Sequence, residues 1–139
     1  MRTTKILWLA VPLVFLLVIG IALWGPGSKR KPEVRVRVIA TKANPEDPQD
    51  VERAKMKIEE AYEVLKKGAK FSQVAGTKSE ADSKSDDGDM GWVGKGVLPQ
   101  HLEDIAFKLD PGQYSEIIQD HAGDQLVFRI LYVEERRNF

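Results

Sequence analysis

An uncharged apolar block near the N-terminus constrains this chain more than any other feature. Residues 6–25, ILWLAVPLVFLLVIGIALWG, contain no charged side chain, and a helix of that length crosses the roughly 30 Å hydrocarbon layer of a membrane. Trp8 and Trp24 lie near its two ends, where aromatic side chains anchor helices at membrane interfaces. We therefore expect residues 1–5 to be a short flank and residues 6–25 to be a transmembrane helix.

A cleaved signal peptide is the alternative interpretation of this block. The apolar core of a signal peptide usually runs about 7–15 residues and ends in a small-x-small cleavage site. This block is longer, and residues 25–27, GPG, match such a site poorly, so an uncleaved anchor is favoured. More Lys and Arg residues follow the block than precede it, which taken literally places the C-terminal part in the cytoplasm.

The rest of the chain is long enough for one small domain. Of 139 residues, those from 34 to 139 remain for a core once the block and a basic linker, 26–33, are set aside. The whole chain has no net formal charge, which argues against a nucleic-acid partner. It has no cysteine and no paired histidines or phosphate-binding loop, so we expect no metal and no cofactor.

Hydrophobic periodicity predicts the first elements of this domain. In VRVRVIA, residues 34–40, valine alternates with arginine at the period of a half-buried strand. Residues 51–67 carry apolar side chains at three- and four-residue steps and predict a helix, with Asp50 as its N-cap and Gly68 at its end.

Shorter elements follow. FSQVA predicts a helical turn, and residues 100–109 have helical spacing that ends at a Asp-Pro-Gly turn. Residues 115–119 and 125–135 predict two strands, with Gly123 as the left-handed residue of the turn between them. The order of the elements is strand, long helix, short helix, helix, strand, strand. This order predicts an α+β domain with helices around an antiparallel sheet.

At this point the sequence resembles a known family. GAKFSQVA, DDGDMGWVGKGVLPQHLEDIAFKLDPGQYSEII and the closing strand are similar, in order and spacing, to the motifs of the parvulin-type (PpiC/rotamase) peptidyl-prolyl cis-trans isomerases. The resemblance covers about residues 34–133. It implies a parvulin-like fold with a four-stranded antiparallel sheet surrounded by helices.

The glycines of residues 86–99 then acquire a structural interpretation. They let the chain leave a polar loop, enter the sheet and approach the substrate groove without Cβ collisions. Trp92 is expected to pack in this crossing, and Asp89 to accept hydrogen bonds from turn amides. Asp87 replaces the first glycine of the family's usual pair, and an aspartate tolerates a left-handed turn position.

The resemblance also implies an apolar slot that grips proline. In parvulins a Met or Leu and two Phe form it, and the matching positions here are identified as Leu98, Leu102 and Phe107. Leu102 replaces an aromatic residue, and ordinary core packing explains it equally well. Rotation about an Xaa-Pro amide faces a barrier of about 18–20 kcal/mol and needs no covalent chemistry, so such a slot can act by stabilising the twisted amide.

The polar half of the site departs from the family pattern. Parvulins commonly carry two histidines and an Asp or Cys, and the matching positions here are Val38, Arg129 and Ala81. Asp82 is adjacent to the acidic position, so Arg129 and Asp82 are the candidate catalytic residues.

The sequence allows two alternative surroundings for Arg129. A buried Arg129 needs a carboxylate such as Asp89 or Asp82; alternatively Arg129 faces solvent while Phe128 enters the core. The two histidines, His101 and His121, are expected to face solvent.

Two functions follow as expectations. One is a membrane-anchored, extracytoplasmic isomerase or foldase helper that binds proline-containing segments of exported proteins. The alternative is a catalytically depleted domain that serves as an accessory or structural subunit of a larger membrane complex. The resemblance favours an extracytoplasmic (periplasmic-side) location, against the count of flanking positive charges.

Overall fold

The computed structural model describes residues 30–138. The predicted flank, the predicted transmembrane helix 6–25 and most of the predicted linker lie outside these residues. Between residues 30 and 138, no helix is long and apolar enough to cross a membrane. From Lys31 onward the chain forms one compact unit.

The alternation of valine and arginine builds the first strand, β1 (Glu33–Ala43). Val34, Val36 and Val38 are buried, as the alternation predicts. Ile39 is buried as well, although it belongs to the opposite face of the strand. The expectation of a half-buried strand is therefore wrong for the second half of β1, which is covered on both faces.

The long helix α2 (Pro48–Lys66) starts earlier than the periodicity predicts. Its N-cap is Asp47, whose side chain accepts hydrogen bonds from the backbone N–H groups of residues 49 and 50, so the prediction of Asp50 as the cap is wrong. Proline at the first helical position explains the shift, because its fixed φ suits a helix start and its missing N–H is not needed there. Gly68, with φ of +95°, follows the helix end as predicted.

The remaining elements are short until the last strand. They are α3 (Phe71–Lys78), the 3-10 helix η1 (Asp82–Asp86), β2 (Asp89–Gly94), α4 (Gln100–Lys108), β3 (Ile118–Ala122) and β4 (Gln125–Arg137). Gly123, with φ of +60°, lies in the turn between β3 and β4, which confirms its predicted role. The predicted strand at 115–119 lies three residues further along the chain.

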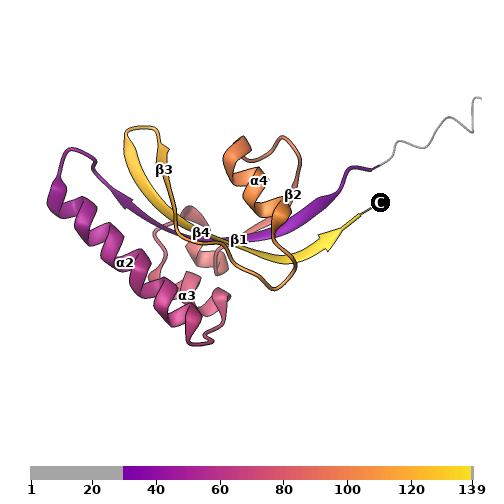
Figure 1. The fold of residues 1–139 in the computed structure, drawn as a ribbon, viewed down its shortest axis with the longest axis horizontal. Helices are drawn as coiled ribbons and strands as arrows, with labels where there is room; N and C mark the ends of the chain where they lie inside the picture. The colour runs from indigo at the N-terminus through magenta and orange to yellow at the C-terminus, as the bar shows by residue number, and fades with distance from the viewer. Residues whose placement is uncertain (1–29, 139) are drawn as a thin grey trace, which may run out of the picture. The chain divides into compact units, whose positions relative to one another are not determined.

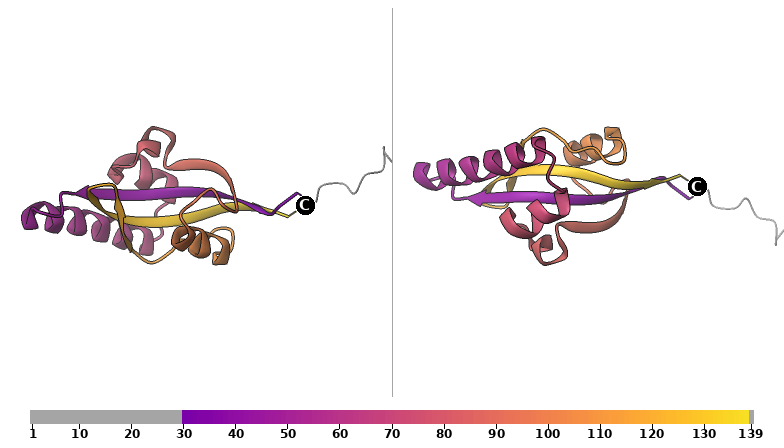
Figure 2. Two further views of the ribbon diagram at one scale, coloured as in Figure 1. Left: turned by 90° about the horizontal axis from the view of Figure 1, so that it is seen from above. Right: turned by 90° about the horizontal axis from the view of Figure 1, so that it is seen from below.

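The four strands form one antiparallel sheet in the order β2-β1-β4-β3. The two longest strands, β1 and β4, run side by side through the centre of the sheet, as both views of Figure 2 show. In Figure 1, α2 and α3 lie on one side of these strands and α4 on the other. The predicted α+β fold with a four-stranded antiparallel sheet is confirmed.

Each face of the sheet has its own core. Toward α2 and α3, the core consists mainly of large side chains, including Ile39, Ile58, Leu65, Phe71, Phe128 and Ile130. Toward α4, valine and alanine predominate, as in Val34, Val36, Val38, Ala40, Val93, Ala106, Val127 and Val133. Adjacent residues of β4 alternate between the two cores, so Phe128 enters the first while Arg129 faces the α4 side.

The glycine-rich stretch crosses close to the sheet at one position. A Cβ on Gly88 would lie 2.5 Å from the carbonyl oxygen of Val38 and 2.8 Å from the Cβ of Ala75. Its carbonyl accepts a hydrogen bond from Val38 N at 2.9 Å. Just before it, Asp87 adopts a φ of 54°, which confirms that an aspartate takes the left-handed position in this turn.

Candidate functional site

A pocket of about 350 Å³ opens on the α4 side of the sheet. The central strands β1 and β4 form its floor, η1 and β2 contribute to its wall, and the N-terminal part of α4 closes it. Because this face carries small side chains, α4 does not fill the space above the strands, and a cavity remains.

Three long apolar side chains line the wall of the pocket, above a floor that is itself largely apolar. Leu98 and Leu102, both predicted to bind substrate, line it together with Met90. The three side chains differ in exposure. Leu102 is 3% exposed and belongs to the core, Leu98 is half-buried, and Met90 is 44% exposed. Met90 is a pocket residue that the sequence did not predict, since its segment was interpreted only as a glycine scaffold. The signal was the apolar residue between Asp89 and Gly91, directly on the predicted path to the groove.

Phe107, the third residue predicted for the slot, does not line this pocket. It packs against the core on the α4 side, and the Lys95 ammonium lies 5.5 Å from the centre of its ring. Five residues along a helix rotate the side chain by about 140°, so Leu102 and Phe107 face different directions from α4. Its role in substrate binding stays a prediction.

The three positions that match the family's polar residues lie together in the structure. Val38 on β1, Ala81 before η1 and Arg129 on β4 all line the pocket. The floor at these positions is therefore apolar except for the guanidinium of Arg129. Val38 and Ala81 offer no side-chain group that can exchange a proton or donate a hydrogen bond.

Two further charged side chains lie at the polar end of the pocket. Asp82 lines it from η1 and is fully exposed, with Oδ1 3.5 Å from the Nζ of Lys42 on β1. An ion pair with so exposed a partner contributes little to stability, because water screens it. Lys42 was also missed, because its distance to the pocket depends on the register of β1 against β4.

Arg129 pairs with Asp120, which is neither of the two carboxylates predicted as its partner. Its Nη1 donates to Oδ2 of Asp120 on β3 at 3.3 Å, and Nε2 of His101 on α4 lies 3.0 Å from the same oxygen. Asp89 and Asp82 bond other cations, so their proposed pairing with Arg129 is wrong. The antiparallel pairing of β3 with β4 explains this, because it places Asp120 beside Arg129.

The protonation of Asp120 reflects these contacts. Burial raises the pKa of its carboxyl, but hydrogen bonds from the backbone of His121 and from His101, with the charge of Arg129, outweigh burial and leave the pKa below its ordinary value. His101 and His121 are both exposed, as predicted. Exposure does not prevent His101 from connecting α4 to the sheet through Asp120.

A second set of ion pairs holds the segment that carries Met90. Arg35 Nη2 donates to Asp89 Oδ2 at 2.6 Å, and the N–H of Gly91 donates to Asp89 Oδ1 at 2.8 Å, which confirms the predicted turn contact. The Arg35 hydrogen bond lowers the pKa of Asp89, with further lowering by Gly91 and the charge of Arg37. Asp89 thus fixes the backbone on both sides of Met90.

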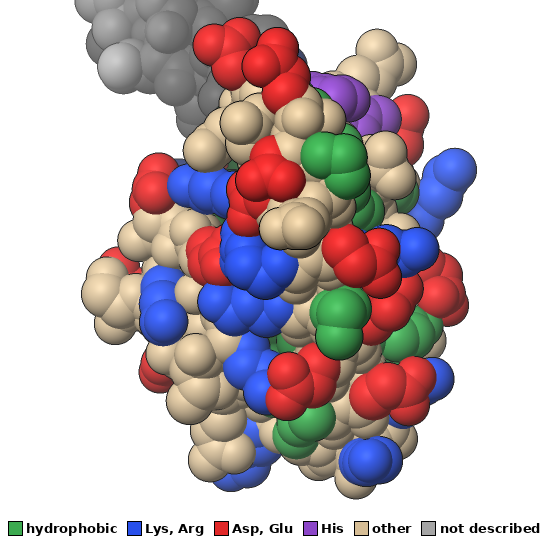
Figure 3. Space-filling model, turned by 90° about the vertical axis from the view of Figure 1, so that its left-hand side faces the viewer, with side chains coloured by type: hydrophobic (Ala, Val, Ile, Leu, Met, Phe, Trp, Pro, Cys, Tyr) green, Lys and Arg blue, Asp and Glu red, His purple; other side chains and the backbone are tan. Residues whose placement is uncertain are grey.

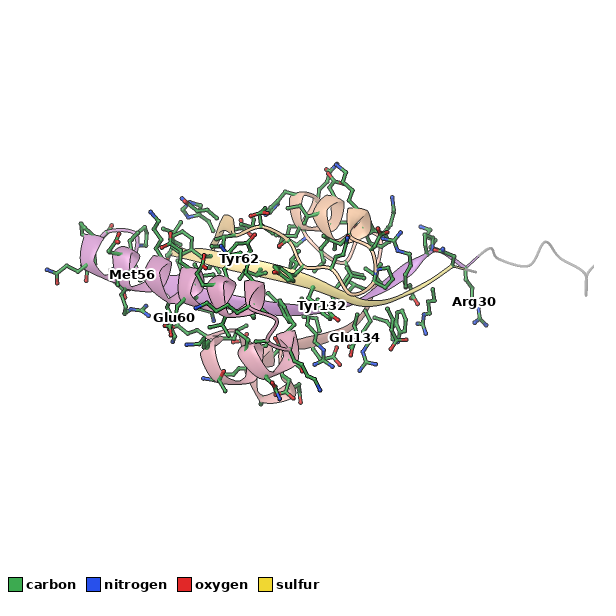
Figure 4. The ribbon with its side chains drawn as sticks, turned by 60° about the horizontal axis from the view of Figure 1, so that its bottom comes forward. Arg30, Met56, Glu60, Tyr62, Tyr132 and Glu134 are labelled. Carbon is green, nitrogen blue, oxygen red and sulfur yellow. The ribbon has the colours of Figure 1, made fainter. Side chains whose placement is uncertain are left out.

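Arg37 extends the same set toward η1 and β4. It bonds both carboxylate oxygens of Glu134 and donates to the backbone carbonyls of residues 86 and 87. Tyr132 and Glu134, labelled in Figure 4, are alternate residues of β4 and belong to the face opposite the pocket. Arg37 therefore attaches the end of η1 to the sheet on the face opposite the pocket.

Candidate metal ligands do not cluster within residues 30–138. No group of three His, Cys, Asp or Glu side chains there is arranged to hold a metal ion. The face in Figure 3 shows Lys and Arg interspersed with Asp and Glu, with hydrophobic side chains scattered among them. On that face no single-sign patch of the kind used by nucleic-acid-binding proteins is present.

Comparison with known proteins identifies the family and the relatives of this domain. The model of the PpiC-type PPIase (rotamase) domain matches residues 38–135. The chain is 39% identical to the chaperone SurA of Hahella chejuensis over 87 residues, which are 61% of this chain and 20% of that protein. It is 42% identical over 78 residues to the periplasmic chaperone PpiD of Haemophilus influenzae, covering 55% and 12% of the two chains. The foldase protein PrsA of Staphylococcus aureus is 33% identical over 102 residues, covering 72% and 32%.

Solved structures agree in fold. The crystal structure of a PpiC-type peptidyl-prolyl cis-trans isomerase domain has a TM-score of 0.63 and 32% identity, covering 78% of this chain and 94% of that one. PrsA from Bacillus subtilis has a TM-score of 0.60 and 29% identity, covering 77% and 36%. The matched region thus spans about a third or less of the full-length relatives. The chain belongs to the PpiC-type peptidyl-prolyl isomerase (rotamase) family.

Proposed function

We propose that this domain binds proline-containing segments of exported polypeptides and accelerates their cis-trans isomerisation, as a foldase helper. The observation that carries the proposal is the pocket between the central strands and α4, with an apolar wall and one guanidinium on its floor. The names of its relatives, a chaperone, a periplasmic chaperone and a foldase, support the same class of function.

The proposed mechanism uses the shape of the pocket. The side chains of Met90, Leu98 and Leu102 hold the pyrrolidine ring and exclude water from the adjoining amide. Loss of hydration strengthens the interaction of the amide with charged groups nearby, here Arg129 and Asp82. No covalent bond is made or broken, so neither a nucleophile nor a proton transfer is needed.

A second function is favoured by a different observation. Val38 and Ala81 place apolar side chains where the family commonly has polar ones. A domain that keeps the pocket but has lost its polar groups can bind a proline-containing partner without catalysing rotation. Such a domain would be an accessory or structural subunit of a membrane complex.

The location of the domain is part of the proposal. We propose that residues 6–25 anchor the chain in the membrane and that the PpiC-type domain lies on the periplasmic side, as the name of the PpiD relative suggests. In intact cells with a permeabilised outer membrane, added protease should then digest the domain. Protection of the domain until the inner membrane is lysed would place it in the cytoplasm.

The two functions are separated by one experiment. The full-length chain in mild detergent is added to an Xaa-Pro tetrapeptide, and the exchange between cis and trans forms is measured by NMR. The isomerase proposal predicts exchange faster than in buffer at catalytic concentrations of protein. Peptide binding with exchange no faster than in buffer would instead support the accessory role.

A further inference from the structure

We propose that Arg129, Asp120 and His101 form the polar half of the peptide site, in which Arg129 donates a hydrogen bond to the prolyl nitrogen and the other two position it. This inference rests on the proposed isomerase function. It assigns a new arrangement of charged residues to a site whose usual polar positions hold Val38 and Ala81.

The three side chains come from three elements that converge at the edge of the pocket. His101 is on α4, Asp120 on β3 and Arg129 on β4, and the first and last both contact Oδ2 of Asp120. The Asp120 side chain is 15% exposed and that of Arg129 is 19% exposed, whereas His101 is 52% exposed. The pair Asp120–Arg129 is therefore shielded from water, and His101 covers it from outside.

Among residues 30–138, Asp120 is the carboxylate that holds Arg129. Within residues 30–138, no other acidic side chain forms an ion pair with Arg129. A partly buried guanidinium without a carboxylate is costly, and it would turn toward solvent. Asp120 accepts a hydrogen bond from Nη1 of Arg129. The other N–H groups of the guanidinium are then available to the pocket that Arg129 lines.

Amide chemistry indicates which atom Arg129 should bind. In the planar amide the nitrogen lone pair is delocalised into the carbonyl, so the nitrogen is a poor acceptor. As the bond twists, the lone pair returns to nitrogen, which then accepts a hydrogen bond. A donor at this atom stabilises the twisted state and not the planar one, and so raises kcat without changing KM. Arginine suits this role because it keeps its proton at any working pH.

His101 contributes through the position of α4. Its bond to Asp120 connects the helix that carries Leu102 with the strand that carries the polar group. The apolar wall and the guanidinium are then held at a fixed separation. His101 and Asp120 are positioning residues in this account, since Arg129 alone of the three lines the pocket.

The test compares four variants of the full-length chain: Arg129→Gln, Asp120→Asn, the double variant and Asp124→Asn. Asparagine keeps the shape and the acceptor oxygen of Asp120 while removing its charge. Asp124 is an exposed carboxylate in the turn of the same hairpin and serves as the matched control. For each protein, kcat and KM for an Xaa-Pro peptide are measured by NMR exchange, and Tm is measured in parallel.

We expect Arg129→Gln to lower kcat on the order of a hundredfold, as removal of one preorganised donor does elsewhere, with KM within about twofold of the wild type. Asp120→Asn should lower kcat by about tenfold through misplacement of Arg129. Asp124→Asn should leave both constants unchanged. In the Arg129→Gln background, Asp120→Asn should have no further effect on kcat, because Asp120 acts only through Arg129.

The possible results separate this inference from the function on which it rests. A wild-type protein that does not accelerate exchange overturns the proposed function and this assignment together. A wild-type protein that does so, with unchanged kcat in Arg129→Gln, overturns the assignment alone. So do equal losses from Asp120→Asn with and without Arg129, which would mean that Asp120 acts by another route.

Discussion

The two faces of the sheet are built differently from the same two strands. Toward α2 and α3, isoleucine, leucine and phenylalanine form much of a packed core, and α2 lies along the second half of β1 (Figure 1); we call this the filled face. Toward α4, valine and alanine line the strands and a helix of nine residues covers them only in part. The first face is packed for stability, and the second keeps a pocket.

This difference indicates where mutations should act on stability and where on function. A large side chain removed from the filled face leaves a void with no compensating role. A side chain removed from the wall of the pocket, such as that of half-buried Leu98, changes a surface that is already in contact with solvent. The following predictions test this division, from the largest expected effect on stability to the smallest.

Ile58→Ala should destabilise the domain most. Ile58 is fully buried between α2 and the sheet, and truncation of such a residue costs about 3 kcal/mol through lost burial and the cavity left behind. The measurement is urea unfolding followed by circular dichroism. Met56→Ala, two residues away on the exposed surface of α2 in Figure 4, should change the unfolding free energy by less than about 0.5 kcal/mol. Equal effects would contradict the account of the filled face.

Gly88→Ala should cause the next largest loss of stability. The added Cβ would collide with the Val38 carbonyl and with Ala75, and φ of +79° adds strain, so a loss of about 2–3 kcal/mol is expected. Gly91 has a similar φ of +77° but open space around its Cα, and Gly91→Ala should cost only about 1 kcal/mol. Thermal unfolding of both variants separates collision from strain. A smaller loss for Gly88→Ala than for Gly91→Ala would be inconsistent with the close approach.

Asp89 should make the domain sensitive to acid. Its pKa is lowered from the ordinary value of 3.8 by the Arg35 hydrogen bond. A carboxyl with a depressed folded-state pKa stabilises the fold above its unfolded value and loses that contribution as pH falls through the folded value. Unfolding free energies of the wild type and of Asp89→Asn should therefore converge as pH falls below about 4. Asp104→Asn, an exposed control on α4, should run parallel to the wild type.

Leu98→Ala should affect stability least and peptide binding strongly. Leu98 is half-buried at the pocket wall, so truncation should cost less than about 1 kcal/mol in unfolding while weakening proline-peptide binding about tenfold. Titration of the full-length chain with an Xaa-Pro peptide provides the dissociation constant. Phe107→Ala is the companion variant, because the family resemblance places this residue in the slot whereas the structure has it outside the pocket lining. Unchanged binding in Phe107→Ala would exclude it from the site.

Local sequence patterns were sufficient to predict the buried helix residues of the filled face. Ala54, Ile58, Ala61 and Leu65 follow the helical period, and all four are buried in α2. The family motifs were sufficient to bring Val38, Ala81 and Arg129 to one place, although none of the three is near another in sequence. Such positions are encoded by the order of elements, which the motifs preserve.

The contacts of the site were not predictable in the same way. Asp120 meets Arg129 only because β3 pairs with β4 in a particular register, and it meets His101 only because α4 packs over that edge. A periodic pattern carries no information about either distance. Phe107 is an example from within one helix. The family resemblance suggested that it lies in the proline slot with Leu102, but the helical rotation between the two positions directs their side chains differently.

The most direct test of the account is to observe one Xaa-Pro peptide and the isotope-labelled full-length chain in the same NMR sample. We predict chemical-shift changes at Met90, Leu98, Leu102 and Arg129, together with cis-trans exchange of the peptide faster than in buffer. Shift changes confined to α2 and α3, with exchange at the uncatalysed rate, would contradict the assignment of function to the pocket on the α4 face.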